Sequence, residues 1–370
     1  MSGFVPAPLA VLPWRILLLV TAIGGFGLVV LYSAAGGSLR PWVIPQGLRF
    51  AMFMIGAVAL SRVPLDWWKK SAFYIYGTFL ILLILVELLG AVRGGSQRWL
   101  GFGPIRIQPS EMMKLAIVLA LARFYDLLPA AETRRFQAIW PAAVLIGMPA
   151  LIVMAQPDLG TGLMICAGGA TLMFLAGVPL RLFVGGALAV ATAIPLAFNY
   201  VLHEYQRHRI LIFMDPESDP LGTGYHISQS KIAIGSGGLF GKGFLQGTQS
   251  HLDYLPEGHT DFVFATMAEE WGLAGGAFLI IAFLLVIRWG VNVGVRAEDR
   301  FAKLAAAGLA TTIFFYMAIN LMMVMGLAPV VGIPLPLVSF GGSAQMTVLI
   351  SLGILMGIDR SISTRQPTRW

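Results

Sequence analysis

The sequence predicts an all-α, polytopic membrane protein with about ten transmembrane helices, both termini in the cytoplasm, and one long periplasmic or extracellular loop between helices 7 and 8. The first observation is composition. Of 370 residues, 57% are hydrophobic and 12% are charged, whereas soluble domains carry about 25% charged residues. The second is a series of apolar runs near the length of about 20 residues that crosses a bilayer core. The third is the distribution of Lys and Arg along the chain.

Ten apolar runs mark the predicted helices in order. They are 14–34, 46–61, 71–90, 110–125, 137–155, 159–177, 180–200, 264–287, 303–325 and 341–358. The first is interpreted as an uncleaved helix, because its apolar stretch is longer than that of a usual signal peptide and nine runs follow. The fifth and sixth are separated only by Gln156-Pro157-Asp158, where proline ends a helix, so a tight hairpin is expected. The domain prediction is one membrane domain over 1–370, with a long outer loop at 201–262 and a cytoplasmic tail at 359–370.

The positive charge sets the orientation. With the N-terminus inside, 15 of the 25 Lys and Arg residues fall in cytoplasmic segments, as the positive-inside rule requires. Four more lie in the long loop, which carries little weight in that rule. Orientation therefore explains most of the net charge of +7, and binding to nucleic acid is not expected. The short outer segments carry more Lys and Arg than the positive-inside rule predicts, which suggests a bound anion or contact with lipid headgroups. These outer residues are Arg40, Arg49, Arg93, Arg98, Arg106 and Lys114.

Two segments resemble known motifs but lack residues that those motifs require. The glycine-rich segment 233–243, AIGSGGLFGKG, has Ser236 and Gly243 where a phosphate loop requires Gly and then Ser or Thr. A compact turn is the simpler interpretation. The run HEYQRH at 203–208 has Arg207 where a zinc protease needs its second His, so no metal site is predicted. The single Cys166 lies in an apolar run and fits a small buried side chain.

Ionisable residues inside apolar helices are costly, and they are therefore candidates for function. Glu111 and Lys114 are three residues apart at the start of the fourth span and share one helix face. They form either an ion pair that lets the helix insert or a paired site that faces a cavity. Asp158 begins the sixth span, where it caps that helix or contributes a polar group to a site. Glu269 and Glu270 lie two turns into the eighth span, and their roles stay open.

Asp261 is the strongest single candidate for an acid or base. It ends the long loop and precedes the apolar run Phe262, Val263 and Phe264 at the outer membrane surface. Partial desolvation there would bring a carboxylate toward the working range of a general base. The competing interpretation is an N-terminal cap of the eighth helix.

Five stretches together resemble the SEDS family (shape, elongation, division and sporulation). They are WLGFGPIRIQPSEMMK (99–114), QPDLGTG (156–162), QSKIAIGSGGLFGKGFLQGTQSHLDYLPEGHTDFVFA (229–265), AEEWG (268–272) and GLAPVVGIPLPLVSFGGSAQ (326–345). The resemblance covers nearly the whole chain, including the ten spans. Within the family it is closer to the elongation-type members than to the division-type members. One departure is Phe340, where related members often have Tyr.

The resemblance implies a peptidoglycan glycosyltransferase of the bacterial inner membrane that polymerises lipid II during cell elongation. In that reaction, the 4-hydroxyl of one lipid-linked disaccharide attacks the anomeric carbon at the reducing end of another chain. Undecaprenyl pyrophosphate leaves and the configuration inverts. The implied partners are a class B penicillin-binding protein, which crosslinks the strands, and the rest of the elongation machinery.

The resemblance also implies the site. Asp261 matches the family's essential acid in HTDF and is the expected base, and Asp158 matches the acid of QPDLG. Glu111 and Lys114 match the paired residues at the head of the fourth span. The outer arginines Arg49, Arg98 and Arg106 are expected to contact the pyrophosphate. No cofactor is firmly predicted. A divalent cation, Mg²⁺ or Mn²⁺, would share the pyrophosphate, although the sequence has no metal cage.

Two alternatives remain at this stage. A lipid II flippase or other transporter would also need charges inside the membrane, but such sites lie near the midplane, often at broken helices or inverted repeats. No repeat is evident here, and Asp261 is expected at the outer surface. A scaffold of the elongation machinery would tolerate the loss of Asp261.

Overall fold

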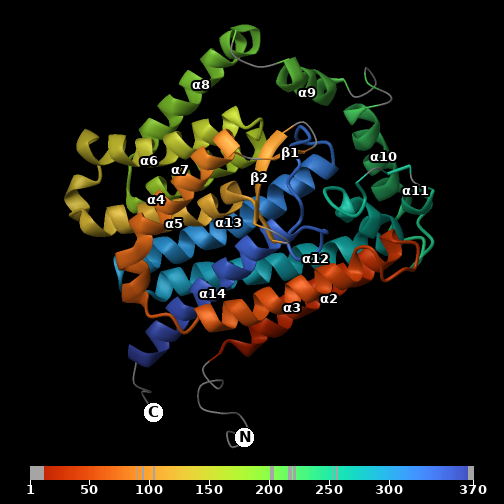
Figure 1. The fold of residues 1–370 in the computed structure, drawn as a ribbon, viewed down its shortest axis with the longest axis horizontal. Coiled ribbons are helices and arrows are strands. Elements are labelled where there is room, and N and C mark those ends of the chain that lie inside the picture. Colours follow the sequence, from red (N-terminus) through yellow and green to blue (C-terminus); the bar gives the residue numbers. More distant parts are fainter. Residues whose placement is uncertain are drawn as a thin grey trace, which may run out of the picture.

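The computed structural model describes residues 12–89, 91–93, 96–102, 105–200, 204–215, 219, 222–252, 254–255 and 257–365. Over these residues, ten long helices follow the predicted order (Figure 1). They are α2 (Trp14–Ala34), α3 (Val43–Leu60), α4 (Leu65–Leu89), α5 (Pro109–Leu127), α6 (Phe136–Ala155), α7 (Leu159–Ala176), α8 (Leu180–Tyr200), α12 (Val263–Arg296), α13 (Arg300–Val324) and α14 (Gly342–Arg365). The predicted all-α membrane fold is confirmed.

Several helices run past the predicted spans. Helix α4 begins at Leu65 rather than 71, α12 continues to Arg296 rather than 287, and α14 continues to Arg365 rather than 358. The apolar runs mark only the stretch that lipid or core can cover, whereas helical hydrogen bonding continues into the charged ends. The first part of the predicted tail at 359–370 is therefore helical.

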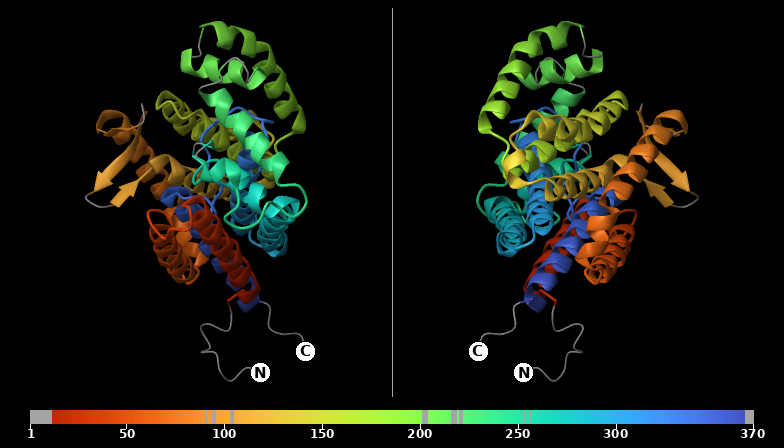
Figure 2. Two further views of the ribbon diagram at one scale, coloured as in Figure 1. Left: turned by 90° about the vertical axis from the view of Figure 1, so that its right-hand side faces the viewer. Right: turned by 90° about the vertical axis from the view of Figure 1, so that its left-hand side faces the viewer.

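Eight of the described helices are long and apolar enough to span a membrane. The other two predicted spans, α5 and α8, fall outside this set for different reasons. Helix α5 carries Glu111, Lys114, Arg123 and Asp126 within 19 residues. In α8 the apolar helix that qualifies by composition, Leu180–Ala193, is short. Most described α8 side chains are exposed, and α8 stands away from the other helices in Figures 1 and 2.

Helix α5 lies at the centre of the protein. It begins with Pro109 at the first helical position, where a missing N–H is tolerated. Every residue from Pro109 to Ala122 is buried, and the helix packs against α4, α7 and α13. Its charged residues are thus shielded from lipid by protein, which explains how so polar a helix sits inside the bundle.

Helix α2 begins and helix α14 ends at the same end of the bundle (Figure 2). That both termini are cytoplasmic stays a prediction. Ion pairs connect the helix ends there: Lys69 pairs with Asp299 and, at 3.9 Å, with Asp126, and Arg296 pairs with Asp359 at 2.7 Å. The opposite end, where α5, α7 and α12 begin, is called the outer end below.

The outer segments are more ordered than a plain loop. Strands β1 (Ala91–Arg93), β2 (Ser96–Phe102) and β3 (Ile105–Ile107) form a three-stranded antiparallel sheet, which projects from the side of the bundle (Figure 2). The sequence analysis did not foresee it, because such short strands leave little pattern beside long apolar runs. The long loop 201–262 contains α9 (Glu204–Met214), α10 (Thr223–Ser236) and α11 (Thr248–His251).

Helix α12 has a kink, and the glycine-rich segment 237–243 forms hydrogen bonds with the helix backbone at that point. At Gly272 the backbone turns to φ 61° and ψ −158°, which breaks the helical hydrogen bonds. Four bonds of 2.9–3.1 Å to the segment replace them: from the Lys242 and Gly243 amides to the Glu269 and Glu270 carbonyls, and from the Leu273 and Ala274 amides to the Gly238 and Leu239 carbonyls. The segment is thus a compact turn that hydrogen-bonds to a helix. This agrees with the interpretation as a compact turn rather than a phosphate loop.

Two glycines of this segment give a matched test. Both have positive φ, +82° at Gly241 and +56° at Gly238. A Cβ at Gly241 would lie 2.0 Å from the Glu270 carbonyl oxygen, whereas one at Gly238 would meet nothing within 4 Å. We expect Gly238→Ala to cost about 1 kcal/mol from backbone strain alone, and Gly241→Ala about 3 kcal/mol or more. Thermal unfolding in detergent measures the difference. Equal unfolding midpoints for the two variants would contradict the close packing of segment 237–243 against α12.

Candidate active site at the outer end

A buried ion pair lies at the head of α5. Lys114 Nζ is 2.6 Å from Glu111 Oε1, and the two residues are only 4% and 6% exposed. The second carboxylate oxygen of Glu111 accepts a hydrogen bond from the Tyr316 hydroxyl of α13. The Tyr316 ring also lies beneath the ammonium group, with its centroid 4.2 Å from Lys114 Nζ, and Met164 Sδ is 3.7 Å from that nitrogen. Tyr316 therefore holds both members of the pair.

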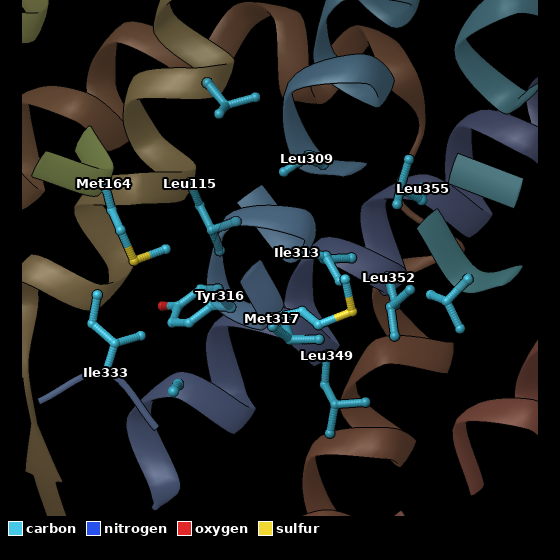
Figure 3. Close-up of a cluster of buried hydrophobic side chains, with 14 of the residues drawn as sticks. Leu115, Met164, Leu309, Ile313, Tyr316, Met317, Ile333, Leu349, Leu352 and Leu355 are labelled. Atoms are coloured by element: carbon cyan, nitrogen blue, oxygen red, sulfur yellow. The ribbon is translucent and has the colours of Figure 1, made fainter. Parts of the chain in front are cut away.

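The surroundings of this pair are apolar. Figure 3 shows the Tyr316 ring among Leu115, Met164 and Ile333, with its hydroxyl pointing away from Met317. In such surroundings a carboxylate needs both a counter-charge and hydrogen bonds. The pair satisfies the structural interpretation, in which it neutralises itself. It is equally compatible with a site, because it holds a lysine side chain at the outer end.

The Tyr316 hydroxyl is expected to contribute more stability than an ordinary buried one. Tyr316→Phe keeps the ring beneath Lys114 and removes the hydrogen bond to an ionised carboxylate, which is worth about 1.5–3 kcal/mol. The matched control is Tyr76→Phe, because the Tyr76 hydroxyl donates at 3.0 Å to the neutral Leu145 carbonyl, a bond worth about 1 kcal/mol. Thermal unfolding of the two variants should differ accordingly. A loss at Tyr316 no larger than that at Tyr76 would contradict this expectation.

Asp261 is not the N-cap residue of α12. The helix begins at Val263 with Phe262 at the N-cap position, and the Phe262 side chain makes no capping hydrogen bond. The Asp261 carboxylate faces the backbone at Gly332, where an added Cβ would lie 3.5 Å from Oδ2. The Asp261 carbonyl accepts a hydrogen bond of 2.9 Å from Asn320 Nδ2.

The α13–α14 connection, residues 325–341, joins the parts of the site. At Gly332 it faces Asp261, and at Ile333 its carbonyl accepts a hydrogen bond of 2.8 Å from Asn320. It also lies tightly against the first turn of α7, where a Cβ at Gly160 would come within 2.8 Å of the Val331 carbonyl. Because Tyr316 is one helical turn before Asn320 on α13, the same few residues border both Asp261 and the buried pair.

Arg49 of α3 lies in the same region, beside a cluster of aromatic rings. Its guanidinium carbon is 5.2 Å from the centroid of Phe340. The Phe340 amide donates to the His259 carbonyl at 2.8 Å, and the His259 ring stacks on Trp42 with centroids 4.0 Å apart. Burial lowers the pKa of His259, although Glu257 partly opposes this, so the ring is neutral at pH 7. The one departure from the family pattern, Phe340, thus supports Arg49 with its ring.

The other predicted residues fall in different places. Asp158 caps α7, accepting from the Thr161 amide at 3.2 Å, so the capping interpretation is confirmed. It also lies 3.5 Å from Gln108 Nε2, just before α5, and a contact with substrate stays a prediction. Arg98 and Arg106 belong to strands β2 and β3, but their side chains lie outside the described residues.

Glu269 and Glu270 have structural partners. The buried Glu269 carboxylate pairs with Lys242 at 2.7 Å and accepts from the Gln249 amide at 3.0 Å, at the start of α11. Glu270 accepts from Ser33 of α2 at 2.5 Å and lies 3.3 Å from His251 Nε2. These acids fasten the outer segment and α2 to α12.

The sequence analysis missed two residues of the site, Tyr316 and Asn320. Both are polar side chains inside the apolar run 303–325, and both are fully buried. The signal that could have found them is their spacing of one helical turn, which puts both on one face of a span. Neither residue is charged, so neither stands out in the sequence as Glu111 and Lys114 do.

The fold and the site define a multi-pass membrane protein with a polar centre at its outer end. A sequence model of the cell cycle protein family of FtsW, RodA and SpoVE matches residues 12–364. The chain is 44% identical over 342 residues to the peptidoglycan glycosyltransferase MrdB of Escherichia coli K12, and the match covers 92% of each. The chain belongs to this family.

Two solved structures have the same fold. One, described as structural coordination of polymerization and crosslinking by a peptidoglycan synthase complex, matches with a TM-score of 0.83 and 31% identity over 95% of this chain and 98% of the other. The rod shape determining protein RodA of Thermus thermophilus matches with a TM-score of 0.72 and 28% identity, over 95% and 97% of the two chains.

Proposed function

We propose that the protein is a peptidoglycan glycosyltransferase that polymerises lipid II into glycan strands during cell elongation. The E. coli relative carries the name peptidoglycan glycosyltransferase, and its similarity extends over 92% of both chains. The observation that carries the proposal is the surroundings of Asp261. This carboxylate lies at the outer end beside Gly332 of the α13–α14 connection, and the same connection packs against the first turn of α7 at Gly160.

The proposed reaction is a single inverting displacement. The 4-hydroxyl oxygen of one disaccharide forms a bond to the anomeric carbon of the other chain, while the bond from that carbon to the pyrophosphate oxygen breaks. Asp261 accepts the hydroxyl proton, a contribution of about 10²–10⁴-fold in rate. Undecaprenyl pyrophosphate departs with the electron pair, so cations must offset its developing charge.

The cations in the proposal come from several outer elements. Lys114 and Arg49 border the site in the described structure, and Arg98 and Arg106 are proposed to reach the pyrophosphate from the sheet. Glu111 holds the Lys114 ammonium group in place, and Asp158 orients the start of α7. Among the described residues, no three His, Cys, Asp or Glu side chains come together as a metal site. A divalent cation, Mg²⁺ or Mn²⁺, therefore enters the proposal only as a companion of the pyrophosphate, and no step depends on it.

The proposed location is the bacterial inner membrane, with the site on its outer face, so lipid II arrives after it has crossed. A class B penicillin-binding protein is the proposed partner, together with the elongation machinery. The description of the synthase complex, in which polymerization and crosslinking are coordinated, supports such a partner. The E. coli match and the ten helices support a multi-pass membrane protein.

A lipid II flippase is the main alternative. A transporter places its charged groups near the midplane of the bilayer. Here Glu111 and Lys114 lie in the first turn and a half of α5, and Asp261 precedes α12. Both positions are at the outer end, which favours chemistry on a substrate that is already outside.

One reconstitution separates the two functions. Proteoliposomes with the protein and its penicillin-binding partner receive fluorescent lipid II, and both glycan strands and transfer across the bilayer are measured. We expect strands from lipid II supplied on the outer face and no faster transfer than in empty liposomes. Transfer without strands would overturn the proposal in favour of a flippase.

A further inference from the structure

Asn320 holds two backbone segments at the proposed site. Its Nδ2 donates to the Asp261 carbonyl at 2.9 Å and to the Ile333 carbonyl at 2.8 Å. The side chain is fully buried on α13. Its Oδ1 accepts no hydrogen bond from the part of the chain that the structure describes. An unpaired buried acceptor lowers stability, so packing alone does not favour an amide here.

The chemistry of the amide explains the residue type. One nitrogen with two N–H groups can donate to two carbonyls at once, whereas a Ser or Thr hydroxyl has one proton and an ionised Asp has none. The two carbonyls belong to segments that are distant in sequence, one before α12 and one in the α13–α14 connection. Asn320 thus acts as a clamp between them.

The clamp fixes the backbone that carries the Asp261 carboxylate and the backbone that the carboxylate faces. One bond holds the residue that carries the carboxylate. The other holds Ile333, the neighbour of Gly332, whose backbone the carboxylate faces. We propose that Asn320 is the positioning residue of the general base, and sets where the Asp261 carboxylate stands relative to the α13–α14 connection. This inference rests on the proposed function.

The test compares three variants at equal folded amounts in lipid II polymerisation with the penicillin-binding partner. Asn320→Leu has nearly the same volume and no donor. We expect kcat to fall about 10–100-fold, because a displacement of about 1 Å from the reactive geometry can cost 10²-fold, while KM stays within about threefold. Asn320→Gln, which keeps the amide, should recover part of kcat. Ser230→Ala removes another buried bond to the α13 backbone, at Val324, and should leave both constants unchanged.

A double-mutant cycle with Asp261→Asn separates positioning from loss of folded enzyme. If Asn320 acts through the base, Asn320→Leu should change the residual rate of Asp261→Asn by less than about threefold, because the two effects are not additive. An equal fall in both backgrounds, or a rise in KM with kcat unchanged, would overturn the inference. If instead the wild type makes no glycan, the proposed function itself fails. If Asp261→Asn is as active as the wild type, Asp261 is not the base, and the inference is overturned although the proposed function stands.

Discussion

Lys114→Met is expected to destabilise the protein by about 3–5 kcal/mol and to abolish glycan synthesis. The substitution removes the ammonium group that lies 2.6 Å from Glu111 and leaves a carboxylate buried without its counter-charge. Breaking a buried pair from one side has this large cost, because the remaining charge loses its partner and cannot regain water. Thermal unfolding in detergent and lipid II polymerisation measure the two effects.

A second variant distinguishes the two interpretations of this pair. Glu111→Gln combined with Lys114→Met removes both charges, and replacing a buried pair by neutral groups is often neutral or stabilising. We expect the unfolding temperature to return close to that of the wild type. Glycan synthesis should stay absent, because the cation for the pyrophosphate is gone. A stable double variant with normal activity would show that the pair serves only to insert α5.

Asp261→Asn is expected to lower the polymerisation rate by about 10²–10⁴-fold, the range for loss of a general base. The amide has the same shape as the carboxylate, and Asp261 is not the N-cap residue of α12, so we expect the thermal stability to change by less than about 1 kcal/mol. Binding of lipid II should persist, since the cations are intact. The control is Asp359→Asn, which removes a carboxylate at the inner end and should leave the rate unchanged.

The sequence predicts the helices well, because the membrane imposes length and apolarity on each span. It also predicts the Glu111–Lys114 pair, because two ionisable residues on one face of a buried helix must find each other. The kink at Gly272 could not be predicted in the same way. It depends on hydrogen bonds to segment 237–243, whose register with α12 is set only in three dimensions.

The site itself is only partly visible in the sequence. Asp261 stands out through its position and through the family resemblance, but whether it caps α12 depends on backbone geometry at Phe262. Asn320 and Tyr316 act through residues that are distant in sequence, namely Asp261, Ile333 and Glu111. Such contacts are made by the packing of α13 against α5 and the α13–α14 connection, which local patterns do not specify.

The most direct test of the account is lipid II polymerisation by the purified protein with its penicillin-binding partner, run beside Asp261→Asn at equal folded amount. We expect glycan strands from the wild type, and at least 100-fold slower synthesis from a variant that unfolds at the same temperature. Equal rates from the two proteins would contradict the assignment of Asp261 as the base and would turn attention to Glu111 as the acid that does the chemistry.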